Sequence, residues 1–118
     1  PPEIDWKRGI LKTEPLFTEL FRKRKEKKRN LAYSVEEYLA KGLAEIAIAY
    51  AEKTGIPTIA VAGGCTYNAH ISQTIRKVIE QHGLKLIRNK SLPPGDGGIS
   101  FGQAVVTGAY EGYESLDR

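Results

Sequence analysis

Two glycine-rich stretches hold the residues best suited to bind a ligand. The first is the pair Gly63-Gly64, which follows the apolar run TIAV that begins at Thr58. Because glycine has no Cβ, the backbone there can adopt unusual dihedral angles and a flat ligand can approach the main chain closely. A glycine pair is also a common way to build a tight turn and nothing more. The pair by itself leaves both interpretations open.

The second stretch, residues 91–98, places one acid among glycines. It reads SLPPGDGG, with Asp96 between Gly95 and Gly97. Two prolines restrict the start of this loop, and the glycines keep other side chains away from the carboxylate. Asp96 could therefore bind a hard metal ion or accompany a phosphate group. It could equally accept hydrogen bonds from neighbouring backbone amides in a turn.

Cys65 and His82 are weaker candidates for chemistry. Cys65 lies in the turn before a predicted helix, where a helix amino terminus can favour a thiolate. No general base lies near it in the sequence, so we expect a buried apolar residue rather than a nucleophile. His82 is the last residue on the apolar stripe of that helix, and we expect it to favour the negative pole of the helix rather than to bind a ligand.

The elements that must position these residues form a β-α-β unit. The run from Thr58 to Gly64 predicts a buried strand with a tight exit turn, and Leu84–Arg88 predicts a second strand. Between them an amphipathic helix is predicted from apolar residues at helical spacing, namely Ile71, Ile75, Val78 and Ile79. Strands joined in this way are parallel, and open α/β sheets bind ligands at the carboxyl ends of such strands. Both glycine-rich loops follow those ends.

A longer helix is predicted before the first strand. Ser34-Val35-Glu36-Glu37 fits a capping box, and Gly55 followed by Pro57 fits a helix end. The expected buried stripe is Val35, Leu39, Leu43, Ile46 and Tyr50. After the second loop, Ile99–Tyr110 predicts a further helix with small residues. We predict two parts: an irregular segment with a basic run over 1–33, and an α/β unit over 34–118.

The net charge comes from one short run. The chain has 118 residues and a formal charge of +4, and Arg22–Arg29 holds seven of its 18 basic residues and one of its 14 acidic residues. Such a run could contact nucleic-acid phosphates. Because no aromatic residue alternates with these charges, a solvated helix end or loop is the preferred interpretation. Nucleic acid is therefore not an expected partner.

Composition limits the classes of protein further. The longest mostly apolar segment, Leu43–Ala51, contains Glu45 and is far shorter than the roughly 20 residues of a membrane span, so no membrane association is expected. One cysteine cannot form an internal disulfide, which favours a cytoplasmic location. Since the chain begins Pro1-Pro2 and has no methionine, we expect a part of a longer protein.

The two motifs together resemble a known family. AVAGGCTYN (Ala60–Asn68) followed by LPPGDGGISFGQAV (Leu92–Val105) is similar to the end of the HypF carbamoyltransferases, whose usual patterns are SGGVFQN and PPNDGGLSLGQA. The same pattern is looser in the threonylcarbamoyl-adenosine transferases of transfer RNA modification. The resemblance covers about Ser34 to Tyr110.

The resemblance implies an α/β fold: part of a ribonuclease-H-like lobe of the actin, sugar kinase and Hsp70 type, with a small parallel sheet packed by helices. This chain would be the last part of the second lobe. By analogy with the family, ATP or a carbamoyl-adenylate binds against Gly63 and Gly64 and is contacted by Asn68. Asp96 would coordinate a divalent metal such as iron, zinc or magnesium. The phosphates would lie beside the next two residues, Gly97 and Gly98.

The resemblance also implies a reaction. The family moves a carbamoyl group from carbamoyl phosphate, through a carbamoyl-adenylate, to the terminal cysteine of an acceptor protein. That group becomes the cyanide ligand of nickel-iron hydrogenase. The chain departs from the family at Ala62, at Cys65-Thr66-Tyr67 and at Gly95. It also lacks the family's His-x-x-x-His pair, because His70 and His82 are twelve residues apart.

We therefore expect no turnover from this chain alone. A single aspartate gives too few ligands for a tight catalytic metal. A small parallel sheet also needs cover on both faces. We expect the missing first lobe to complete the protein, or self-association into a dimer or larger species. A non-catalytic nucleotide-binding or protein-interaction module is the alternative, and an RNA-associated basic protein is a weaker one.

Overall fold

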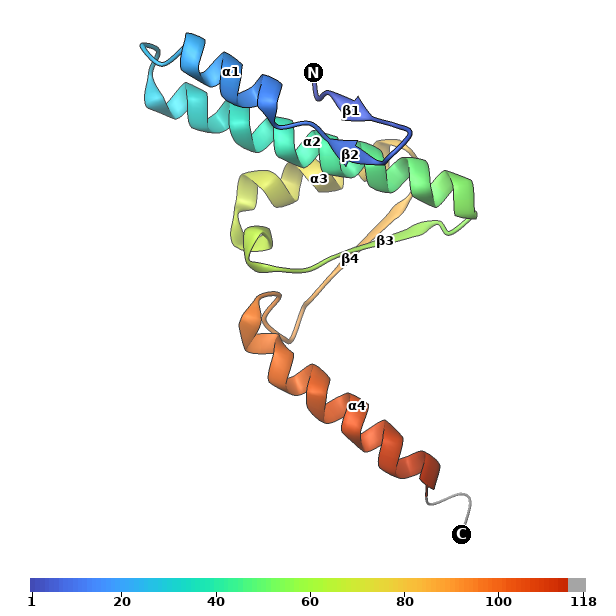
Figure 1. Cartoon of the computed structure of the whole chain (residues 1–118). Coiled ribbons are helices and arrows are strands. Elements are labelled where there is room, and N and C mark those ends of the chain that lie inside the picture. The colour runs from blue at the N-terminus through green and yellow to red at the C-terminus, as the bar shows by residue number, and fades with distance from the viewer. Residues whose placement is uncertain (115–118) are drawn as a thin grey trace.

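The computed structural model describes residues 1–114, and the side chains of residues 1–109. The long helix α2 divides the molecule, as Figure 1 shows. On one side of α2 lie α1 and the β1–β2 hairpin, and on the other lie α3 and the β3–β4 sheet. In order, the elements are β1 (Ile4–Asp5), β2 (Ile10–Leu11), α1 (Glu14–Arg22), α2 (Lys28–Thr54), β3 (Thr58–Val61), η1 (Gly64–Tyr67), α3 (Ala69–Gln81), β4 (Lys85–Arg88), η2 (Asp96–Gly98) and α4 (Ile99–Glu114).

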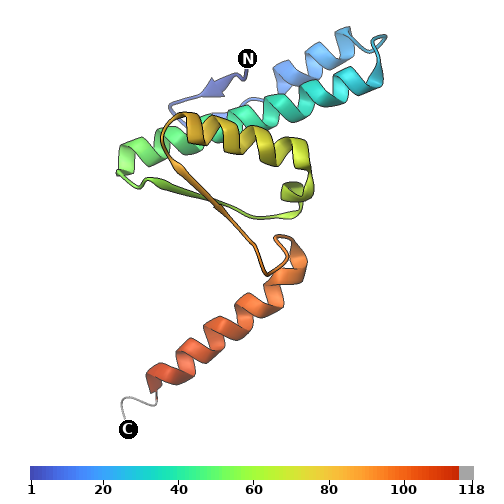
Figure 2. The same ribbon diagram turned by 180° about the vertical axis from the view of Figure 1, so that it is seen from behind.

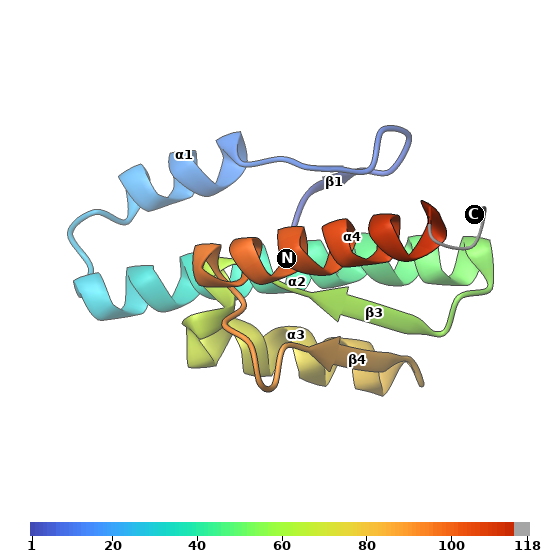
Figure 3. The ribbon, with the colours of Figure 1, turned by 90° about the horizontal axis from the view of Figure 1, so that it is seen from below.

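The predicted β-α-β unit is confirmed. Strands β3 and β4 are parallel and in register from the pair Thr58 and Lys85 to the pair Val61 and Arg88. Figure 3 shows them side by side, with α3 and α2 behind them. The apolar stripe of α3 is also confirmed, since Ile75 and Ile79 are buried. Both strands therefore end at the same edge of a small sheet covered by helices on one face.

The core lies between α2 and α3. Ala40, Ala44 and Ile48 of α2 pack against Ile75 and Ile79 of α3. Alanine side chains let the two helix backbones approach closely, so this face of α2 takes the contact with α3. Apolar residues of the sheet, including Ile59, Val61 and Leu86, pack against the same cluster.

The predicted buried stripe of α2 is wrong. Leu43 and Tyr50 are 54% and 53% exposed, and the other three members are only half-buried. The helix has two apolar faces, and the face with the smaller side chains forms the core. Gly42 lies on a different contact: a Cβ there would lie 2.5 Å from the Leu11 side chain, so β2 packs directly on the α2 backbone.

The predicted start of α2 is wrong as well. The helix begins at Lys28, so Ser34 lies inside it and its hydroxyl donates to the Asn30 carbonyl oxygen at 2.9 Å. Glu37 makes no reciprocal cap and instead bonds Thr74 of α3. A capping box and a solvent-facing serine in a helix interior share the same residue types, which is why the pattern misled. The end at Gly55 is confirmed, with a φ of 71°.

The first 33 residues contain regular structure. β1 and β2 form a short antiparallel hairpin. The Tyr38 hydroxyl of α2 donates to the Lys12 carbonyl oxygen at 2.6 Å and accepts from the Glu3 amide at 3.0 Å, which ties the hairpin to α2. The basic run Arg22–Arg29 covers the end of α1, a turn and the start of α2, and every residue of it is exposed.

Helix α4 extends away from the rest of the molecule (Figures 1 and 2). Its main contacts among the described residues are with η2, which directly precedes it. Ile99, Phe101, Val105 and Val106 are each more than half exposed. Within the described part of the chain, no helix combines the length and the apolar character needed to cross a bilayer.

Candidate functional site

The structure brings the two glycine-rich loops together. The Gly63 amide donates to the Pro94 carbonyl oxygen at 2.6 Å. This hydrogen bond joins the loop after β3 to the loop after β4, at the edge where the parallel strands end (Figure 1). The predicted location of both loops at one edge of the sheet is therefore confirmed, although the two motifs are about thirty residues apart in sequence.

The first loop presents bare backbone to its surroundings. Gly63 has a φ of 101°, a conformation that side chains other than glycine rarely adopt. A Cβ built on Gly63 or on Gly64 would meet no atom within 4 Å. The glycine at 63 is thus required by its backbone angle, whereas the one at 64 leaves open space. Such an opening is compatible with a flat ligand lying against the main chain.

The glycines of the second loop are required by close packing. A Cβ on Gly98 would lie 2.6 Å from the Pro93 carbonyl oxygen, and one on Gly97 would lie 3.1 Å from the Pro93 ring. A Cβ on Gly95 would lie 3.3 Å from the Tyr67 ring of the first loop. The sequence predicted prolines that restrict the start of this loop and glycines that keep other side chains away. The structure adds that the loop is folded on Pro93 and against the first loop.

Hydrogen bonds hold the first loop against α3. The Thr66 hydroxyl donates to the Gly63 carbonyl oxygen at 2.7 Å, and the Ser72 hydroxyl donates to the Thr66 carbonyl oxygen at 2.7 Å. The backbone amide of Asn68 donates to the Cys65 carbonyl oxygen at 3.1 Å. Neither Thr66 nor Ser72 was predicted as a site residue, although the hydroxyl of Thr66, two residues after Gly64, was a signal for such a bond.

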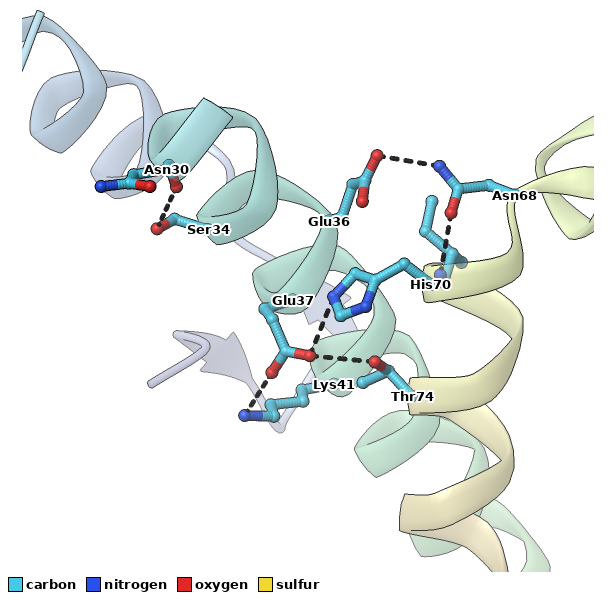
Figure 4. Close-up of polar contacts among 9 residues, drawn as sticks. Asn30, Ser34, Glu36, Glu37, Lys41, Asn68, His70 and Thr74 are labelled. Atoms are coloured by element: carbon cyan, nitrogen blue, oxygen red, sulfur yellow. Dashed lines mark hydrogen bonds and ion pairs between the residues drawn. The ribbon is translucent and has the colours of Figure 1, made fainter. Parts of the chain in front are cut away.

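Asn68 is the amino-terminal cap of α3. Its side-chain oxygen accepts from the Ile71 amide at 3.0 Å, and its side-chain nitrogen donates to Glu36 Oε1 of α2 at 2.8 Å. Figure 4 shows the amide held between the two. The structure thus gives Asn68 a local structural role that the resemblance did not imply. Whether it also contacts a nucleotide stays a prediction.

Glu37 joins α2 to α3 one residue further along. Its Oε1 accepts from the Thr74 hydroxyl at 2.9 Å, and its Oε2 pairs with Lys41 (Figure 4). Buried Nε2 of His70 lies 3.1 Å from Oε1 in a contact that is not aligned as a hydrogen bond. The hydrogen bond from Lys41 is the largest cause that lowers the pKa of Glu37, and the same bond raises the pKa of Lys41.

Asp96 lies at the start of η2 with its side chain exposed. No hydrogen bond to its carboxylate forms within residues 1–109 of the described structure, so the turn interpretation gains no support from side-chain bonding. The described residues also contain no group of three or more His, Cys, Asp or Glu side chains placed to hold a metal ion. By themselves they do not fit a metal centre, and Asp96 can supply at most one ligand of a shared site.

The expected burial of Cys65 is wrong, because the residue is exposed. It lies in η1, whose residues turn outward between β3 and α3 and leave its thiol in solvent. His82 fits the predicted helix-end role, with its Nδ1 atom 2.8 Å from the Val78 carbonyl oxygen. A cleft of about 900 Å³ lies between α1, α2 and the amino-terminal residues rather than at the glycine-rich loops.

Comparisons with known proteins agree with this architecture. Residues 1–103 match the family described as "Carbamoyltransferase, Kae1-like Domain, second subdomain". The probable carbamoyltransferase HypF of Methanocaldococcus jannaschii is 38% identical over 109 residues, which cover 91% of this chain and 14% of that protein. A tRNA N6-adenosine threonylcarbamoyltransferase of Trichodesmium erythraeum is 36% identical over 59 residues, which cover 50% of this chain and 18% of that protein.

A solved structure gives the same result. The crystal structure of HypF from T. kodakarensis matches 94% of this chain with a TM-score of 0.77 at 30% sequence identity, and the chain covers 15% of that structure. This match confirms the predicted α/β lobe. The chain spans only a small part of the length of these relatives. It belongs to the HypF carbamoyltransferase family, in which it corresponds to the second subdomain of the Kae1-like domain.

Proposed function

We propose that this chain supplies the nucleotide-facing part of a HypF-type carbamoyltransferase site. The proposed reaction is ATP-dependent transfer of a carbamoyl group from carbamoyl phosphate, through a carbamoyl-adenylate, to the terminal cysteine of an acceptor protein in nickel-iron hydrogenase maturation. The observation that carries the proposal is the hydrogen bond between Gly63 and Pro94, which joins both family motifs at the ligand-binding edge of a parallel sheet.

The residues of the two loops have different proposed roles. Gly63 and Gly64 let the nucleotide lie against the main chain, and their open surroundings support that role. Asn68 contacts the nucleotide with the hydrogen-bonding capacity that its cap leaves free. Gly97 and Gly98 keep η2 compact beside the phosphates, since side chains there would collide with Pro93.

Asp96 is proposed as one ligand of a divalent metal. Its exposed carboxylate, without hydrogen-bonding partners in residues 1–109, is available to a cation. The other ligands must come from outside the described residues, and we assign no chemical step to the metal. We propose that a first lobe supplies them, either in the same protein or through a separate chain, and that self-association covers the sheet where such a lobe is absent. A cytoplasmic location stays a prediction.

Nucleotide titration tests the proposal. We expect calorimetry on the complete gene product to detect ATP or ADP binding, and Gly64→Val to weaken it at least about tenfold by filling the space at the loop. The melting temperature should not change, because a Cβ at this position meets no atom within 4 Å. Glu52→Val, at an exposed position in the last turn of α2, is the control. Equal heats for Gly64→Val and the unsubstituted protein would contradict the nucleotide role.

Asp96→Asn tests the metal role separately. A neutral amide is a poor ligand for a hard cation, so carbamoyl transfer to the acceptor cysteine should fall while the melting temperature stays constant. If Asp96 is only a turn residue, the substitution should cost about 1 kcal/mol of stability and leave transfer intact. A non-catalytic nucleotide-binding module would bind nucleotide without any carbamoyl transfer, and a protein-interaction module would bind neither nucleotide nor metal.

A further inference from the structure

Glu36 is the feature that the proposed function does not yet use. It lies on α2, thirty-two residues before Asn68, and both side chains are half-buried. Its Oε1 accepts from the side-chain nitrogen of Asn68 at 2.8 Å, while the side-chain oxygen of Asn68 accepts from the Ile71 amide at 3.0 Å (Figure 4). The cap bond alone fixes the oxygen of the amide. The second bond, to Glu36, fixes the plane of the amide as well.

The held amide keeps capacity for a ligand. A side-chain amide has two N–H donors and two acceptor lone pairs on its oxygen. The bonds to Glu36 and Ile71 use one donor and one lone pair, so one of each remains. A group whose orientation is fixed before binding loses less freedom when a ligand arrives. Fixing the amide plane therefore favours binding in one orientation.

Further hydrogen bonds connect the cap of α3 to the glycine turn. The Ser72 amide donates to the Asn68 carbonyl oxygen at 3.0 Å, and the Ser72 hydroxyl donates to Thr66. Thr66 in turn donates twice to the Gly63 carbonyl oxygen, from its amide at 3.1 Å and from its hydroxyl at 2.7 Å. Since Gly63 bonds Pro94, hydrogen bonds run from α2 through the cap of α3 to both loops.

We infer that Glu36 is a positioning residue for nucleotide binding: its carboxylate holds the Asn68 amide plane and, through the cap of α3, the Gly63 turn. This inference rests on the proposed nucleotide role of the loops. In this inference Glu36 acts through its bond to Asn68 and does not itself touch the nucleotide. The acceptor atom is what matters, and the negative charge does not.

Calorimetric titration with ADP on the complete gene product tests the inference. Glu36→Ala should weaken ADP binding up to about tenfold, the upper scale of one lost hydrogen bond. Glu36→Gln keeps an acceptor oxygen and should restore affinity to within about twofold or improve it. Glu52→Ala, at an exposed glutamate of the same helix, is the matched control and should leave affinity unchanged.

A double substitution separates positioning from general loss of structure. If Glu36 acts through Asn68, then Glu36→Ala should have no further effect on ADP affinity in an Asn68→Ala background. Additive losses, or failure of Glu36→Gln to restore binding, would overturn the positioning role. If Asn68→Ala weakens ADP binding and Glu36→Ala does not, the positioning role of Glu36 is overturned while the proposed function stands. Absence of ADP binding in the unsubstituted protein would overturn the proposed function, and the positioning role with it.

Discussion

Helices α3 and α4 show how differently two apolar helices of one chain can be used. In α3, Ile75 and Ile79 are buried against α2 and the sheet. In α4, which is the richer in apolar residues, Ile99, Val105 and Val106 are more than half exposed. The difference comes from topology, since α3 connects two parallel strands and must pack on them, whereas α4 leaves the carboxyl edge of β4 and extends away (Figure 1).

The comparison indicates which parts of the lobe are complete. The unit from α2 to β4 closes its own core with alanines and isoleucines. The apolar side chains that the structure describes on α4 are left exposed. Since the chain covers only 14% of its M. jannaschii relative, the first lobe proposed above is the expected cover. Substitutions in matched pairs can test this division.

The largest effect is expected for truncation in the α2–α3 core. Ile79 is fully buried, so Ile79→Ala should lower the free energy of unfolding by about 3 kcal/mol through lost burial and a cavity. Val106 is 63% exposed, and Val106→Ala should change stability by less than about 0.5 kcal/mol in the 118-residue chain.

Urea unfolding of both variants measures the difference, and the complete gene product gives a second comparison. If the first lobe covers α4, Val106→Ala should cost measurably more stability in the complete protein than in the 118-residue chain. The same small cost in both would show that α4 is not covered there. Similar large costs for Ile79→Ala and Val106→Ala in the short chain would contradict the division between the two helices.

A smaller effect is expected at the loops, where two family glycines differ. Gly98→Ala would place a Cβ 2.6 Å from the Pro93 carbonyl oxygen, and because that atom is backbone the loop must shift, at about 1–3 kcal/mol. The Cβ that Gly64→Ala adds meets open space at a position without positive φ. The free energy of unfolding should therefore change by less than about 0.5 kcal/mol. Thermal melting of the pair provides the measurement. An equal loss from Gly64→Ala would mean that the first loop is not open.

The sequence predicted the framework of the lobe because its signals are local. Apolar spacing located α3, a run with small residues located α4, and glycine with proline located the end of α2 at Gly55. The parallel pairing of β3 with β4 followed from the helix between them, and it brought Gly63 and Asp96 to one edge. The family motifs then assigned the lobe, as the comparisons confirm.

Contacts between distant residues could not be predicted in the same way. Glu37 looked like part of a local cap of its own helix, yet it bonds Thr74 more than thirty residues away, and its neighbour Glu36 bonds Asn68 at a similar separation. The buried face of α2 depends on which side α3 approaches, which helical spacing in α2 alone cannot reveal. Cys65 was expected to be a buried apolar residue because no general base lies near it in the sequence, and the structure leaves it exposed.

The smallest predicted effect concerns the bond between Glu37 and Thr74, which ties α3 to α2 and has no counterpart on α4 among the described side chains. The Lys41 hydrogen bond lowers the pKa of Glu37 below its ordinary 4.5, so the carboxylate stabilises the fold above that pH and loses its contribution as pH falls through the lowered value. The raised pKa of Lys41 keeps the pair intact until strongly alkaline pH.

Glu37→Gln should therefore lower the free energy of unfolding by about 1 kcal/mol near pH 7, and this loss should shrink below about pH 4.5. Urea unfolding from pH 3 to 8 measures this, with Glu52→Gln as the exposed control. A cost for Glu37→Gln that stays constant down to pH 3 would show that the ionised carboxylate does not hold α3 to α2.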